Sequence, residues 1–284
     1  MSSTTSAKLP TYFIGHGGVT ILFRDGTEPI RSGLLGIGRE IKRLKPEAIV
    51  ITSGHFQSRD ETIQVNVKEP TKVWHDFSFD YHDTYPHVYQ YDYPHRASAS
   101  LARQVLTHLQ ENGIEAEAVE RDLDHGVWVP FKLMFPEGDD DGALDIPIVE
   151  VSTYRSDDYQ AHIELGKVLS TLPGRILVIG SGMLVHNLHA SQTQPAEGPT
   201  YARDVEETAL SYLNATTAEE RTAGLLALQK RADWKLAHPT EDHILPLYVT
   251  LGAGLDEREH KVWNQGLDTA GMSFVSFRLG EAAA

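Results

Sequence analysis

Histidine is the residue type through which this sequence can do chemistry. The chain holds 14 histidines and no cysteine among 284 residues, which excludes disulfides, thiolate metal sites and cysteine nucleophiles. Three of the histidines come after glycine at the ends of short apolar runs: His16 after "YFIG", His55 after "IVITSG" and His186 shortly after "ILVIGSG". Neutral imidazole is the commonest metal ligand in proteins. One histidine after a strand is more often a cap or a hydrogen-bonding group, but three in one sheet favour a metal site.

The segments that must position these histidines alternate between two hydrophobic patterns. Short β-branched runs are typical of buried strands, and apolar residues at helical spacing are typical of helices. The expected strands are 11–15, 47–54, 62–67, 146–153, 174–182 and 273–279, and the expected helices are 31–44, 97–113, 156–172 and 202–214. This alternation predicts a single α/β domain with a mostly parallel central sheet flanked by helices. Ligands of such sheets bind beyond the carboxyl ends of the strands, where the three histidines fall.

A further group of chemically competent side chains lies in "AHPTEDHILPL", residues 237–247. Pro239 predicts the start of a helix there. Acidic residues are favoured in a first helical turn, which by itself accounts for Glu241 and Asp242. His243 has no such role and is expected to face the strand-end histidines. It is the preferred further metal ligand, with Glu241 as the carboxylate alternative.

Three other segments stand out. "LDHGVWVP" places His125 beside a glycine and before a short expected helix. Residues 74–95 form a long aromatic stretch with little helical signal; loops of this length in compact domains are usually functional or disordered, and the aromatic content argues against disorder. "EGDDDGALD" at 137–145 is expected to be a solvated acidic loop, with a calcium site as the less favoured alternative.

Composition restricts the partners and the location of the protein. A net charge of −15 disfavours nucleic acid, anionic membranes and polyanionic substrates. Residues 1–10 are polar and lack the apolar core of a secretory signal, so a flexible N-terminal segment is expected, followed by one catalytic domain at 11–280. No apolar run approaches the ~20 residues of a membrane span. The expectation is a soluble, cytoplasmic protein, with a homo-oligomer left open.

Several motifs together resemble one family. They are "GHGG" at 15–18, "SGHF" at 53–56, "HDF" at 75–77, "LDHGVW" at 123–128, "IPIVEVS" at 146–152, "GSGMLVHNL" at 180–188 and "HPTEDHILPL" at 238–247. In order and spacing, over nearly the whole chain, the sequence resembles the DODA-type extradiol aromatic ring-opening dioxygenases, which are related to the class III protocatechuate 4,5-dioxygenases.

This resemblance implies cleavage of a catecholic substrate, such as L-DOPA, by O₂ at a mononuclear non-haem metal, usually Fe(II), to give a muconic semialdehyde-type product. It implies that His16 and His55 bind the metal and that His243 is the further ligand. His186 is implied as a metal neighbour or ligand and as an acid or base. His125 is expected to line the substrate pocket, and it shares the acid–base role with His186.

The resemblance also bears on the substrate pocket. His75 and Trp128 are expected as substrate contacts. Gly54 and Phe56 stand where many members of the family carry alanine and tryptophan, which should alter the shape of the pocket. The stretch 76–94 is longer and richer in histidine and tyrosine than the common family pattern, so the substrate itself is not fixed by the resemblance.

Other functions stay open at this point. A site of three or four imidazoles would also hold Zn²⁺, which does no redox chemistry. One alternative is therefore a zinc hydrolase that uses a metal-bound hydroxide and needs no O₂. The other is a non-enzymatic binding protein of the same fold. That alternative predicts a degraded ligand set, and it is disfavoured because His16, His55, His186 and His243 are all present.

Overall fold

The computed structural model describes residues 8–137, 145–193, 200–257, 260–263, 267–269 and 271–282. The expected acidic loop at 137–145 and the expected N-terminal segment at 1–10 lie largely outside these residues. Within them, no helix combines the length and the apolar character needed to cross a membrane.

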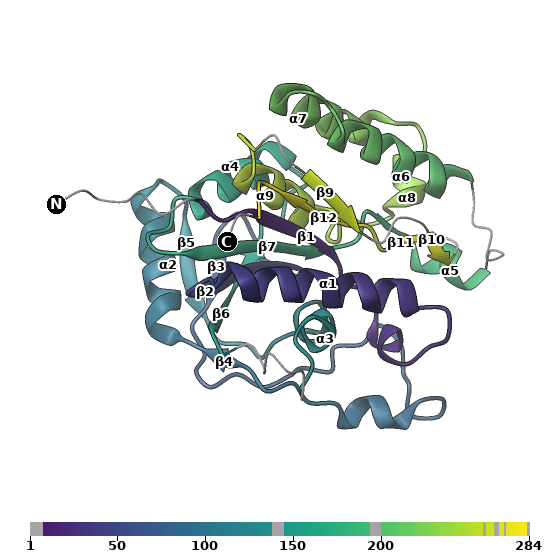
Figure 1. Cartoon of the computed structure of the whole chain (residues 1–284), viewed down its shortest axis with the longest axis horizontal. Helices are drawn as coiled ribbons and strands as arrows, with labels where there is room; N and C mark the ends of the chain where they lie inside the picture. Colours follow the sequence, from purple (N-terminus) through teal and green to yellow (C-terminus); the bar gives the residue numbers. More distant parts are fainter. Residues whose placement is uncertain are drawn as a thin grey trace.

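A mixed sheet forms the centre of the molecule, with strand order β5-β3-β6-β2-β7-β1-β12-β9 (Figure 1). The strands in chain order are β1 Thr11–Gly15, β2 Ala48–Gln57, β3 Ile63–Asn66, β4 Arg96–Ala97, β5 Ala116–Val119, β6 Pro147–Thr153, β7 Ile176–Gly182, β9 His260–Trp263 and β12 Ser276–Leu279. The strands β6, β2, β7 and β1 run parallel, as do β3 and β5, whereas β12 pairs antiparallel with both β1 and β9, and β3 pairs antiparallel with β6. The predicted mostly parallel sheet is therefore confirmed.

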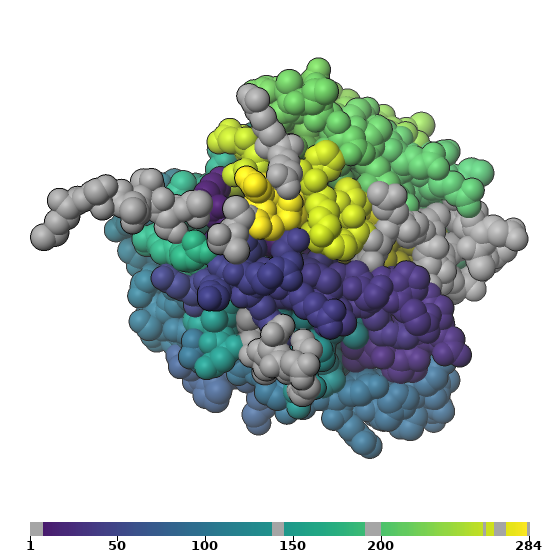
Figure 2. Space-filling model, viewed as in Figure 1, coloured from purple at the N-terminus to yellow at the C-terminus, as the bar shows by residue number. Residues whose placement is uncertain are grey.

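Helices cover both faces of the sheet because the parallel strands are apolar on both sides. The helices are α1 Glu28–Leu44, α2 Ala99–Glu111, α3 His125–Met134, α4 Tyr159–Leu169, α5 Leu188–Thr193, α6 Thr200–Leu213, α7 Ala218–Ala227, α8 Trp234–Ala237 and α9 Leu245–Ala253. Helices α1 and α3 share one hydrophobic core with the sheet, and α4 and α9 pack on the other face. In the space-filling view, the green segment with α6 and α7 forms a ridge above the yellow C-terminal strands (Figure 2).

The carboxyl ends of the parallel strands meet at one edge, and this edge carries the candidate site. β1 ends at Gly15 directly before His16, and β2 carries His55 close to its end. Beyond β7 the chain forms β8 Val185–His186, which pairs with β11 Met272–Ser273 in a second, three-stranded sheet completed by β10 Leu267–Thr269. The sequence patterns did not predict β8, because two residues are too few to show periodicity.

One local prediction is wrong. The helix expected to begin at Pro239 begins at Leu245, because Pro246 lacks a backbone N–H and fits only the first turn of a helix. Glu241 and Asp242 therefore lie in the preceding turn and not in a helix. His162 of α4 is fully buried, with Nδ1 directed at the carbonyl of Asp158 and Nε2 accepting the N–H of Tyr154.

Candidate metal centre

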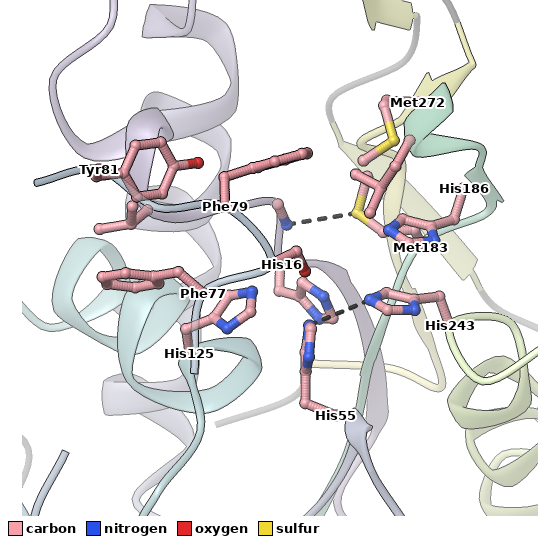
Figure 3. Close-up of a pocket in the computed structure, with 15 residues that line it drawn as sticks. His16, His55, Phe77, Phe79, Tyr81, His125, Met183, His186, His243 and Met272 are labelled. Atoms are coloured by element: carbon pink, nitrogen blue, oxygen red, sulfur yellow. Dashed lines mark hydrogen bonds between the residues drawn. The ribbon is translucent and has the colours of Figure 1, made fainter. Parts of the chain in front are cut away.

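Three imidazoles converge at the carboxyl edge of the sheet. One ring nitrogen each from His16, His55 and His243 lies within 4.8 Å of the others. The closest pair is Nε2 of His55 and Nε2 of His243, 3.1 Å apart, and Figure 3 shows both rings directed toward His16. These three histidines were expected to meet, and the fold brings them together from the end of β1, from β2 and from the turn before α9.

The turn that carries His243 is held against the sheet by backbone contacts. The backbone N–H of Met183 donates to the carbonyl of His243 at 2.8 Å, directly after β7. This approach needs a glycine at the strand end, because a Cβ on Gly182 would lie 2.2 Å from that carbonyl oxygen. A Cβ on Gly54 would likewise crowd the His243 ring at 3.2 Å. The glycines at the strand ends therefore make room for the third imidazole.

Hydrogen bonds of the outer ring nitrogens fix the tautomers of His16 and His243. Nδ1 of His243 lies 2.6 Å from a carboxylate oxygen of Asp242, which can only accept a hydrogen bond, so Nδ1 carries the proton. Nδ1 of His55 faces Asp76 at 3.6 Å. In His16, Nδ1 lies 3.0 Å from the hydroxyl of Ser181, and that hydroxyl donates its own proton to the carbonyl of Gly126.

Nδ1 protonation leaves Nε2 of His16 and of His243 unprotonated. Neutral imidazoles that bring one ring nitrogen each to the same place, with Nε2 of His55 3.1 Å from Nε2 of His243, form a donor set that fits a divalent metal. Burial and then the neighbouring imidazoles hold the pKa of His16, His55 and His243 well below the ordinary value, so each ring is neutral and able to ligate. Imidazole suits both iron and zinc.

His125 stands beside these three rings and is fixed by Asp76. It is the first residue of α3, and its ring centre lies 3.9 Å from that of His55. One carboxylate oxygen of Asp76 accepts both the backbone N–H of His125, at 2.8 Å, and its Nδ1–H, at 2.9 Å. The same carboxylate faces His55, and these three residues form a second close group of polar atoms. The Nε2 atom of His125 is thereby left as an acceptor.

His186 lies against His243 and does not belong to the group of three ligating nitrogens. The two rings are stacked, with centres 3.6 Å apart and planes within 8° of parallel. Burial lowers the pKa of His186 to about 4, although the carboxylate of Asp242 opposes this effect. The geometry favours the implied role of metal neighbour over that of ligand.

The carboxylate alternative for the further ligand, Glu241, points elsewhere. Its carboxylate accepts the hydroxyl proton of Tyr159 and pairs with Lys235. Glu241 is in neither of the close groups of metal-binding side chains found among the described residues. His243 is the member of "PTEDH" that faces the other two histidines.

A buried ionic cluster supports the floor of the site. The guanidinium of Arg121 lies 3.1 Å from both Asp124 and Glu150 and 3.3 Å from the carbonyl of His55. Burial raises the pKa of Glu150 well above its usual range, and the neighbouring Asp124 adds to this effect, so Glu150 is the protonated member of the pair. Asp124 accepts from the hydroxyl of Ser53, and the oxygen of that hydroxyl accepts the backbone N–H of His55.

The cavity above the imidazoles is lined on its outer side by the long aromatic stretch. Phe77, Phe79 and Tyr81 form one wall, and Met183 and Met272 lie opposite (Figure 3). The prediction that the stretch 74–95 shapes the site is consistent with this placement. The four expected chemical residues His16, His55, His186 and His243 all line this cavity, as does His125.

The two expected substrate contacts are placed differently. Trp128 is fully buried and donates from Nε1 to the carbonyl of Trp74. His75 bonds the carbonyl of Tyr91 through Nε2, at 2.9 Å. Both rings lie beside Phe77, at 5.6 and 6.2 Å between centres, and neither lines the cavity in this structure. They pack against Phe77 on the side away from the cavity.

Asp76 and Ser181 are site residues that the sequence patterns did not predict. Both were within quoted motifs, "HDF" and "GSGM", and a polar residue next to a candidate ligand is the signal that points to them. Such partners orient the ligating histidines and select their tautomers.

Comparison with known proteins agrees with the fold and the site. The catalytic LigB subunit of aromatic ring-opening dioxygenase matches residues 10–280. A 4,5-DOPA dioxygenase extradiol of Mirabilis jalapa is 32% identical over 247 residues, which cover 86% of each chain. A 4,5-DOPA dioxygenase extradiol-like protein of Schizosaccharomyces pombe is 32% identical over 220 residues, or 75% of this chain and 70% of the relative.

A solved structure shows the same fold. The crystal structure of an uncharacterised protein from Escherichia coli K12 superposes with a TM-score of 0.73 at 23% identity and covers 96% of this chain and 100% of the other. The family match and the relatives together place the chain among the extradiol-type ring-opening dioxygenases. The chain belongs to the family of catalytic LigB subunits of aromatic ring-opening dioxygenases.

Proposed function

We propose that this protein is an extradiol catechol dioxygenase that uses Fe(II). The observation that carries the proposal is the convergence of one ring nitrogen each from His16, His55 and His243, below a cavity lined by two further histidines. These three residues would hold the metal. When bound, the metal supplies binding of the catecholate oxygens and activation of O₂ at one centre, which makes their reaction effectively intramolecular. In the resting preparation, Zn²⁺ can occupy the same donors.

His125 takes the proton that a catechol hydroxyl must lose. Its Nδ1–H donates to Asp76, so Nε2 presents a lone pair to the cavity. The carboxylate also stabilises the imidazolium that forms, which makes His125 both a base for the substrate and a later acid for the product. General acid–base catalysis of this kind contributes about 10²–10⁴ in rate.

His186 contacts the substrate from the side of the cavity opposite His125. Its low pKa keeps the ring neutral near pH 7, so it can accept a hydrogen bond from the second hydroxyl. Its stacking on His243 fixes its plane. Phe77 and Phe79 exclude water from the cavity, and His75 and Trp128 support Phe77 from behind. The carbon–carbon bond next to the diol is cleaved, both oxygen atoms of O₂ enter the product, and the product is a muconic semialdehyde.

The test is anaerobic reconstitution with Fe(II), followed by measurement of O₂ uptake with a panel of catechols that includes L-DOPA. We expect one O₂ consumed per catechol and two labelled oxygens in the product from ¹⁸O₂. Resorcinol, whose hydroxyls cannot chelate one metal, and the zinc-loaded protein are the controls. The absence of uptake with every catechol would refute the proposal.

One observation favours a second candidate function. Three imidazoles without a carboxylate are also the ligand set of catalytic zinc in carbonic anhydrase. A zinc hydrolase would act on esters or amides without O₂. Hydrolysis by the zinc-loaded protein under argon, together with no uptake of O₂ by the iron-loaded protein, would favour that function.

A further inference from the structure

The cavity wall that faces away from the three imidazoles is apolar. In Figure 3, Phe79, Tyr81 and Met272 lie on the side opposite His55. Met272 is 8% exposed, and Phe79 is 38% exposed at the mouth. Because the metal would draw the two hydroxyls of a catechol to the imidazoles, a substituent on the far side of the ring would lie against these aromatic and thioether groups.

No lysine or arginine lines this cavity among the described residues. Arg121 lies beneath His55 and is engaged by Asp124 and Glu150.

Arg24 is the nearest described cation on the aromatic side. Burial raises the pKa of Tyr81, and Arg24 is close enough to oppose this effect, but Arg24 does not line the cavity. The polar groups that do line this side are Ser78 and the hydroxyl of Tyr81. They can donate hydrogen bonds, but they carry no charge to balance a carboxylate.

On the basis of the proposed function, we infer that the substrate is a catechol whose ring substituent is uncharged and apolar, and that Phe79 and Met272 select against a carboxylate on that substituent. An ionised carboxylate loses its hydration against aromatic and thioether surfaces and gains no cation in return, which makes its burial costly. An alkyl or aryl group gains free energy from the same contact. Amino acids such as L-DOPA would therefore be poor substrates.

A matched pair of ligands tests this inference. 3-(3,4-Dihydroxyphenyl)propanoate and its methyl ester share the catechol ring and differ in the charge of the tail. Binding of each to the zinc-loaded protein, measured by calorimetry, gives a dissociation constant without turnover. We expect the ester to bind at least about tenfold more tightly than the acid, and the iron-loaded enzyme to show the same order in kcat/KM for O₂ uptake.

Substitution of Phe79 tests whether this residue causes the preference for the ester over the acid. Because Phe79 is partly exposed, arginine fits at this position with its stem along the wall. Phe79→Arg should improve binding of the acid by about tenfold or more, and Phe79→Gln, which removes the ring without adding charge, should not. Unchanged zinc content in both variants shows that the metal site is intact.

The outcomes separate this inference from the proposed function. Turnover of catechol together with equal or tighter binding of the acid would overturn the inference and leave the dioxygenase intact. Tight binding of the acid that is lost in Arg24→Gln would also overturn it and would assign Arg24 as the carboxylate partner. Failure to bind or oxidise any catechol, ester included, would overturn both.

Discussion

A carboxylate oxygen of Asp242 lies 2.6 Å from Nδ1 of His243, its neighbour in the chain. This contact keeps the proton on Nδ1 and leaves Nε2 to face His55. Asp242→Asn weakens the acceptor and should lower the affinity for zinc by about 10–100-fold, the usual effect of losing such a partner. The measurement is competition with a chelator of known affinity.

Glu241→Gln is the matched control for that experiment. Glu241 is adjacent to Asp242, but its carboxylate is engaged by Tyr159 and Lys235. Its loss should leave zinc affinity within about twofold, at a modest cost in stability. If Glu241→Gln loses metal and Asp242→Asn does not, then Glu241 is a ligand, and the site is the arrangement of two histidines and one carboxylate.

His55→Ala should remove most of the bound metal. His55 supplies one of three converging nitrogens, and its ring fills little of the hydrophobic core, so the fold should persist. Metal content by elemental analysis and circular dichroism measure the two effects. His108→Ala, which changes a histidine bonded to Val168 and Thr171 outside the site, should keep full occupancy. Full occupancy in His55→Ala would remove His55 from the ligand set.

His125→Ala should retain the metal and lose turnover by about 10²–10⁴. His125 is placed beside the three imidazoles and takes its orientation from Asp76. Asp76→Asn should also lower kcat, but it should preserve most of the bound metal. Metal loss in His125→Ala would make His125 a ligand, and unchanged kcat would exclude it from catalysis.

Acid should destabilise the metal-free protein partly through His162. Burial lowers the pKa of His162 from 6.5 to about 4, so between these values the unfolded chain binds the proton and the folded chain does not. Stability is therefore full above pH 6.5 and falls as pH drops toward 4, by at most about 1.4 kcal/mol per pH unit for this group. His162→Gln, which can keep both hydrogen bonds, should flatten the slope of the unfolding free energy measured in urea at pH 7.5 to 4.5. An unchanged slope would count against this source of acid sensitivity.

The positions of the strand-end histidines were predictable because the strands that carry them can be predicted from the sequence. β1 and β7 are runs of buried residues that end in glycine, and in β2 Gly54 directly precedes His55. Parallel strands with helical connections bring their carboxyl ends to one edge, where His16 and His55 meet and where His186 lines the same cavity. His243 was also expected to join them, although it comes from a turn and not from the first turn of a helix.

The orientation of the site depends on long-range contacts that local patterns do not show. Asp76 reaches His125 across 49 positions of sequence, and Ser181 reaches His16 across 165. The local pattern alone is that of a residue on the surface of a helix at His162, whereas in the folded protein its ring accepts the backbone N–H of Tyr154. His75 and Trp128 carry the right residue types for substrate contact, but the folded aromatic stretch places Phe77 between them and the cavity.

The position of β1 sets the order in which this enzyme can be assembled in the cell. The first strand of the chain lies between β7 and β12, whose residues are 176–182 and 276–279. During translation His16 leaves the ribosome first, but its strand has no second neighbour until almost the whole chain has followed, and His243 also emerges late. Contacts this distant in sequence form slowly. A chain that ends before residue 243 lacks one of the three converging imidazoles, so we expect metal uptake to follow the synthesis of most of the chain.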